Sequence, residues 1–144
     1  MLELVKSDNR QLFCILVNQN GLEELTRWML CSNESIRYLC SQICHLLYKD
    51  SKSVQNMFVA VKGHTKLVQM LLWSSKNDKE LNYILRFTED LVIYQQMKVR
   101  KKIRDLFKQA MLRKVLDQIE RETSNKKILM RIKLLKLKIS QVNI

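Results

Sequence analysis

Apolar residues recur along this chain with the spacing of amphipathic helices. Residues 34–48 give the clearest example, because their apolar side chains lie three or four positions apart, as on one face of an α-helix. The positions concerned are Ile36, Leu39, Cys40, Ile43 and Leu47. Two shorter helices are predicted before it, at 9–19 and 22–30, and Ser32 or Asn33 is expected to cap the long helix. The first 50 residues therefore predict a group of three helices.

The same pattern returns further along the chain. At an offset of 42 residues, apolar positions of the first group fall on apolar positions of 51–72, and Gly21 falls on Gly63, the only other glycine. After residue 75 the offset becomes 45, and the polar stretch SSKNDK provides a loop that can absorb the change. We expect Asn77 or Asp78 to cap the next long helix. The chain is thus built from internal repeats.

Repeats of this period are typical of stacked helices, in which each unit buries its apolar face against its neighbours. The absence of proline also favours helices throughout. The sequence predicts an all-α fold, an α-solenoid of about three helical repeats in a single domain, 1–144. The expected units are 9–50, 51–95, and a degenerate basic repeat or cap at 96–144, with 1–8 as the remnant of a preceding helix. The helices of the last unit are expected near 96–107, 109–121 and from residue 124.

The two glycines are expected to act as hinges. Gly21 and Gly63 each fall between the first and second helices of a unit. A residue without a Cβ atom can adopt the left-handed conformation that ends one helix and allows the next to begin. The third unit has no glycine at this position.

The order of elements resembles the armadillo family: a short helix, a glycine, an apolar LxxLxxxL helix, a polar Ser/Asn turn and a long third helix. Two segments carry this resemblance, over about residues 9–93: NRQLFCILVNQNGLEELTRWMLCSNESIRYLCSQICHLL and SKSVQNMFVAVKGHTKLVQMLLWSSKNDKELNYILRFTEDLV. The resemblance implies an armadillo-like stack in which the third helices line a concave groove.

The resemblance also implies where a partner would bind. In the nuclear-import receptors of that family, a Trp and an Asn four residues later on each third helix hold an extended basic peptide. Here those positions hold Ser41 and His45, then Arg86 and Asp90, so the Trp/Asn ladder is absent. Our candidates for a partner-binding concave face are Arg37, Ser41, His45, Asn82, Arg86 and Asp90. The alternative is that they form an ordinary solvated helix face.

Positive charge is concentrated at one end of the sequence. Residues 98–144 carry 15 Lys and Arg against 4 Asp and Glu, a net charge of +11, whereas residues 1–97 come to +1. The segment KVRKKIR forms a basic patch of Lys98, Arg100, Lys101, Lys102 and Arg104. It has the composition of a nuclear-localisation signal, it could contact phosphates, or it is a solvated helix face. Nonspecific polyanion contact follows from charge alone.

The last helix carries two apolar stripes. At 100° per residue, one stripe is formed by Ile128, Ile132, Leu135, Ile139 and Val142. The other, on nearly the opposite side, is formed by Met130, Leu134 and Leu137. One stripe can close a core, so the other is expected to meet a partner or a second copy of the chain, or to be partly covered by neighbouring side chains.

Catalytic and metal-binding patterns are weak. Cys40, Cys44 and His45 lack the paired spacing of a structural zinc site and are expected to pack in the core. No phosphate-binding glycine loop or HExxH helix is present. Trp28 and Trp73, each near the end of a second helix, are expected to pack against neighbours. We therefore expect no enzyme activity, no cofactor and no metal.

The sequence predicts an interaction scaffold or adaptor that binds an extended peptide or a partner helix. The alternative is a basic module that docks acidic partners or nucleic-acid backbone through residues 98–138. A bilayer span needs about 20 consecutive apolar residues, and no run approaches that length. The four cysteines fit reduced thiols, and a cytoplasmic and/or nuclear location is expected.

Overall fold

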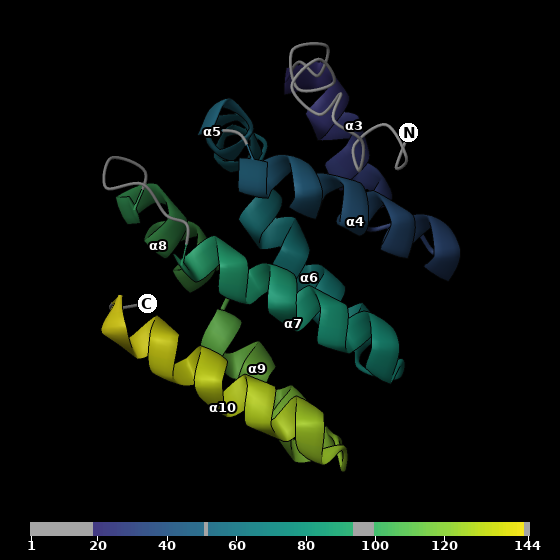
Figure 1. Cartoon of the computed structure of the whole chain (residues 1–144), viewed down its shortest axis with the longest axis vertical. Coiled ribbons are helices and arrows are strands. Elements are labelled where there is room, and N and C mark those ends of the chain that lie inside the picture. Colours follow the sequence, from purple (N-terminus) through teal and green to yellow (C-terminus); the bar gives the residue numbers. More distant parts are fainter. Residues whose placement is uncertain (1–18, 51, 94–99, 143–144) are drawn as a thin grey trace. The chain divides into compact units, whose positions relative to one another are not determined.

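The computed structural model describes residues 19–50, 52–93 and 100–142 (Figure 1). Across these ranges the chain forms eight helices and no strand. The all-α prediction is therefore confirmed. The expected remnant at 1–8, and all but the last residue of the helix expected at 9–19, lie outside the described residues.

The chain divides into two compact units, and the border lies within helix α6, between Lys66 and Leu67. The described helices of unit 1 are α3 (Gln19–Trp28), α4 (Glu34–Asp50), α5 (Lys52–Ala60) and the first turn of α6 (Gly63–Ser74). Unit 2 contains the rest of α6, then α7 (Asp78–Ile93), α8 (Arg100–Gln109), α9 (Leu112–Glu122) and α10 (Lys126–Gln141). In unit 2, α7 and α10 lie side by side and α9 packs on α10 (Figure 1).

An aromatic cluster forms part of the core of unit 1. Tyr48 of α4, Phe58 of α5 and His64 of α6 are buried and meet edge to face. The ring centroids are 5.5 Å apart for Tyr48 and Phe58 and 5.2 Å apart for Phe58 and His64. The Gln55 side-chain amide donates to the Tyr48 backbone carbonyl at 2.9 Å, so the end of α4 is tied to α5.

The expected hinge role of the glycines is wrong. Gly21 lies inside α3, and Gly63 is the first residue of α6; neither has a positive φ. Among the described residues, the left-handed ones between helices are Lys62 and Met111, each with φ of 59°. Gly63 is required for a different reason, because a Cβ atom there would come within 2.5 Å of the Phe58 ring.

Asparagine caps begin the three longest described helices, α4, α7 and α10. Asn33 Oδ1 accepts from the Ile36 amide at 3.1 Å, and Asn77 Oδ1 accepts from the Glu80 amide at 3.1 Å. Asn125 Oδ1 accepts from the amides of the second and third residues of α10, at 3.0 and 3.3 Å. The caps expected for α4 and α7 are confirmed, and the three asparagines provide a common reference point for aligning α4, α7 and α10.

Counted from these caps, α4 and α7 are related by 44 positions. Burial follows this register, since Cys40, Cys44 and Leu47 of α4 correspond to Ile84, Thr88 and Leu91 of α7, all buried. The expected offset of 45 is therefore wrong by one residue. It relied on apolar matches, and an amphipathic helix with a wide apolar face offers nearly equal matches one position apart.

Helix α10 begins 48 positions after α7 and has only one of the two buried rows that α7 has. The α7 residues Glu80, Ile84, Phe87 and Leu91 are buried, and so are their equivalents Ile128, Ile132, Leu135 and Ile139. A second buried row on α7 contains Leu81, Leu85, Thr88 and Val92. On α10 the corresponding residues are Leu129, Lys133, Lys136 and Ser140, which are half-buried or exposed.

Candidate functional site: a groove between α7 and α10

Only three of the six candidate groove residues are accessible in the structure. Arg37, Ser41 and His45 are buried, so they do not form the exposed helix face expected of them. The Arg37 guanidinium donates to the Cys31 carbonyl at 3.1 Å. The physical reason is the register, because Arg37 and Ser41 correspond to buried leucines on α7.

The other three candidates lie on the accessible side of α7. Arg86 is exposed, whereas Asn82 and Asp90 are half-buried. The Asn82 side chain is engaged by α10, since its Oδ1 accepts from Arg131 Nε at 2.8 Å. This side of α7 therefore faces a groove shared with α10.

Polar side chains join α7 to α10 along this groove. Asn125 donates to Asp78 Oδ2 at 2.9 Å where the two helices begin. Further along, Glu89 accepts from Lys138 and lies 3.8 Å from the Arg131 guanidinium. These bonds hold the two helices in a fixed register. The sequence reading missed them, although aligning Asn77 with Asn125 would have indicated which positions face each other.

The apolar strip of α10, formed by Met130, Leu134 and Leu137, is exposed as its spacing predicts. The exposed fractions of these residues are 67%, 50% and 61%. Counting back 48 positions, the strip corresponds to Asn82, Arg86 and Glu89 of α7. In this alignment the same side is thus polar on α7 and apolar on α10.

Two hollows border the apolar strip. The first, of about 640 Å³, lies between α7 and α10. Its lining includes Met130 and Leu134 on α10 and Asn82 and Glu89 on α7. The second, of about 370 Å³, lies between α9 and α10 and includes Leu137. The strip is therefore a ridge between two depressions.

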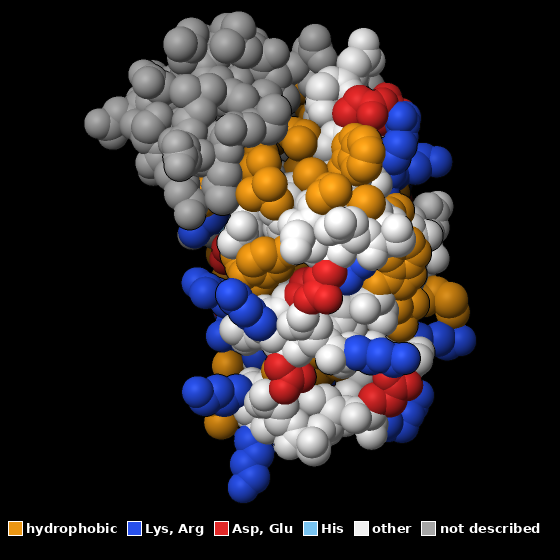
Figure 2. All heavy atoms as spheres, turned by 90° about the vertical axis from the view of Figure 1, so that its right-hand side faces the viewer, with side chains coloured by type: hydrophobic (Ala, Val, Ile, Leu, Met, Phe, Trp, Pro, Cys, Tyr) orange, Lys and Arg blue, Asp and Glu red, His pale blue; other side chains and the backbone are white. Residues whose placement is uncertain are grey.

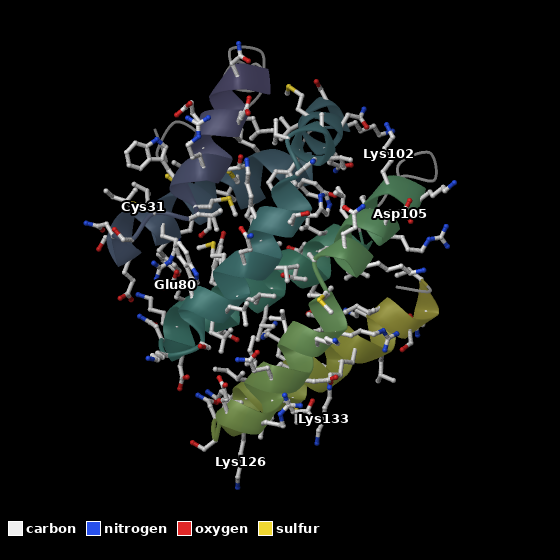
Figure 3. All side chains as sticks on the ribbon, turned by 180° about the vertical axis from the view of Figure 1, so that it is seen from behind. Cys31, Glu80, Lys102, Asp105, Lys126 and Lys133 are labelled. Atoms are coloured by element: carbon white, nitrogen blue, oxygen red, sulfur yellow. The ribbon has the colours of Figure 1, made fainter. Side chains whose placement is uncertain are left out.

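Cations stand on both sides of the strip, and several are paired. Lys136 binds Asp117 and Glu120 of α9. The hydrogen bond from Lys136 lowers the pKa of Asp117. Lys126, Lys127 and Lys133 are exposed. Figure 3 shows Lys126 and Lys133 projecting away from α10, and Figure 2 shows Lys and Arg side chains standing out around this end of the molecule.

The basic patch is only partly described. Lys98 lies outside the described residues, and α8 begins at Arg100, whose side chain is also outside them. Lys101 and Lys102 are exposed, and Arg104 is half-buried. Figure 3 shows Lys102 on the solvent side of α8.

Trp28 and Trp73 pack only in part against their neighbours. The exposed fractions of Trp28 and Trp73 are 49% and 52%. Each lies within the last two residues of its helix, α3 or α6.

Cys40 and Cys44 pack in the core as expected. Burial raises the pKa of both thiols, so neither is a ready nucleophile. Burial lowers the pKa of His64 to about 3, which keeps this imidazole neutral. Among the described residues, no three His, Cys, Asp or Glu side chains gather closely enough to hold a metal ion.

Comparisons with family models, with curated proteins and with solved structures found no match to this chain. Within the described ranges, no helix combines the length and apolar content needed to cross a bilayer. The functional assignment therefore depends on the geometry of the chain itself, and above all on the α7–α10 groove and the apolar strip beside it.

Proposed function

We propose that this chain is a non-enzymatic interaction module that binds a protein partner, an extended peptide or a partner helix, across the α7–α10 groove and the apolar strip. The apolar strip carries this proposal. Its three large side chains are at least half exposed, whereas the opposite stripe of the same helix is fully buried from Ile128 to Ile139. Because that buried stripe holds α10 in place, the strip is ordered before any partner arrives, which limits the entropy lost on binding.

We further propose that the helices form armadillo-like repeats. The support is the recurrence of asparagine-capped third helices at intervals of 44 and 48 residues. Each of the last two is preceded by two shorter helices, α5 and α6 or α8 and α9. The free cysteines Cys31, Cys40 and Cys44 fit the reducing conditions of a cytoplasmic or nuclear location.

The apolar strip would supply part of the free energy of binding. Complete burial of one exposed Leu or Met side chain contributes about 1.5–3 kcal/mol. The strip residues begin at least half exposed, so a partner that covers all three gains a few kcal/mol. Polar contacts along α7 would add orientation more than affinity.

Peptide selection on the immobilised full chain tests the proposal. Peptides from a display library should bind wild type and lose most of their binding to the double variant Leu134→Ser/Leu137→Ser. The matched control is Ile36→Ser/Leu39→Ser, which removes two exposed apolar side chains from α4. Selected peptides that bind both variants equally well would contradict the proposal.

A second candidate function is a basic module that docks acidic partners or nucleic-acid backbone through residues 98–138. The observation that favours it is the exposure of Lys101, Lys102 and Lys108 on α8, whose Ile103 and Phe107 are buried. Such binding would depend steeply on salt, whereas binding through the apolar strip would depend on it less.

A further inference from the structure

We infer that the partner of the apolar strip is an amphipathic helix whose apolar side chains are flanked by Asp and Glu. This inference rests on the proposed function and deepens it, because it names the chemistry of the partner. Three observations support it. Exposed lysines flank the strip, the backbone groups inside α10 bond one another, and the face of α10 on which a further repeat would stack is largely polar.

Exposed lysines lie on both sides of the strip, and on the α7 side Asp78, which is bonded to Asn125, also borders the hollow. On a helix with 100° per residue, Lys127 lies on the α7 side of the strip, and Lys126 and Lys133 lie on the α9 side. All three are exposed. The carboxylates bonded to α10 are already engaged, Glu89 by Arg131 and Lys138, and Asp117 and Glu120 by Lys136. A partner with acidic flanks would therefore meet unneutralised lysines.

The strip favours a helix over an extended segment. An extended peptide needs partners for its own backbone N–H and C=O groups, and the interior of α10 has none to offer because its backbone groups bond one another. Side-chain amides could substitute, but the strip consists of Met and Leu, and the nearby Asn82 already accepts from Arg131. A helix satisfies its own backbone and can place side chains in the two hollows beside the ridge.

The strip is not the surface on which a further repeat would stack. The second buried row of α7 corresponds on α10 to Leu129, Lys133, Lys136 and Ser140, so that face of α10 is largely polar. The strip corresponds instead to the accessible side of α7, where Arg86 is exposed. The apolar strip therefore lies on the side of α10 that a ligand can reach.

A second copy of the chain is a poor occupant. Two strips facing each other would bring the lysine borders of both copies together, and like charges in close opposition oppose association. Charge complementarity thus selects an acidic partner over self-association.

Three synthetic helical peptides test this inference by fluorescence anisotropy with the full chain. All carry leucines at positions i, i+4, i+7 and i+11, and their flanking positions hold Glu, Gln or Lys. We expect the Glu peptide to bind at least about tenfold more tightly than the Lys peptide. The double variant Lys127→Glu/Lys133→Glu should reverse this order. The matched control Lys101→Glu/Lys102→Glu, with the same change of net charge on α8, should preserve it.

A second set of variants separates failure of this inference from failure of the proposed function. Leu134→Ser should weaken all three peptides, and Leu39→Ser should weaken none, with circular dichroism confirming that both variants fold. Equal affinity for the Glu and Lys peptides, with Leu134→Ser still harmful, overturns the acidic partner and leaves the proposed function standing. No effect of Leu134→Ser overturns both. Sedimentation showing a dimer that Leu134→Ser dissolves, without peptide binding, identifies a second copy as the occupant and overturns the inference.

Discussion

Gly63 shows how a single absent side chain determines local packing. The sequence marks its position between two helices, but the reason for it appears only in three dimensions, where the Phe58 ring occupies the place of a Cβ atom. The left-handed turn is made instead by Lys62, a residue type with no special preference for it. The position of Gly63 in the sequence therefore predicts a sharp connection between two helices, but not which residue makes it.

Replacing Gly63 with alanine should destabilise the protein despite the higher helix propensity of alanine. Phe58 is buried against Tyr48 and His64 and has no room to withdraw, so we expect the free energy of unfolding to fall by about 2 kcal/mol in urea denaturation. Gly21→Ala is the matched control. Gly21 is exposed within α3 and has no positive φ, so we expect a gain below about 1 kcal/mol there. Equal stability of the two variants would contradict this account.

His64 should make stability depend on pH. Burial lowers its folded-state pKa from 6.5 to about 3, so between these values the unfolded chain binds a proton that the folded chain does not. Stability therefore falls as pH decreases, by about 2 kcal/mol between pH 7 and pH 5. His64→Leu removes this contribution, and its denaturation midpoint should change less over that range. If the two midpoints change in parallel, His64 is not the source.

At the scale of elements, helix ends and helix faces were predictable, and the register between helices was less so. Asn33 and Asn77 follow polar turns, and a side-chain oxygen at that place is a local signal that needs no tertiary information. The two stripes of α10 were also readable, because the angular separation of Ile128 and Met130 does not depend on neighbours. The one-residue register error arose between helices, where only packing decides.

The Asn125 cap should contribute measurably to the stability of α10. Its side chain accepts from two backbone amides and donates to Asp78, so it both starts the helix and ties it to α7. Asn125→Ala should lower the free energy of unfolding by about 1 kcal/mol in thermal or urea denaturation. Ser124→Ala, at the exposed preceding position, should change it by less than about 0.5 kcal/mol. An equal effect of both substitutions would show that the cap is not responsible.

At the scale of the whole molecule, charge is readable from sequence but its availability is not. The net charge of +11 over residues 98–144 is a matter of counting. The pairing of Arg131, Lys136 and Lys138 with carboxylates of α7 and α9 cannot be counted from the sequence, because it brings together residues up to 49 positions apart. The burial of the groove residues expected on α4 was not predictable for a similar reason, because it depends on which other segments cover the helix.

Binding to a polyanion should report the charge that remains available. A short fluorescent DNA duplex should bind the full chain weakly, and its affinity should fall linearly with the logarithm of salt concentration. Removing two phosphate-contacting lysines by Lys101→Gln/Lys102→Gln should reduce the steepness of that line by about 2. Lys52→Gln/Lys76→Gln changes the net charge equally at exposed positions outside residues 98–144 and should leave the steepness nearly unchanged. If both pairs reduce it equally, the attraction comes from net charge and the patch on α8 has no special role. If neither pair reduces it, α8 does not contact the phosphates.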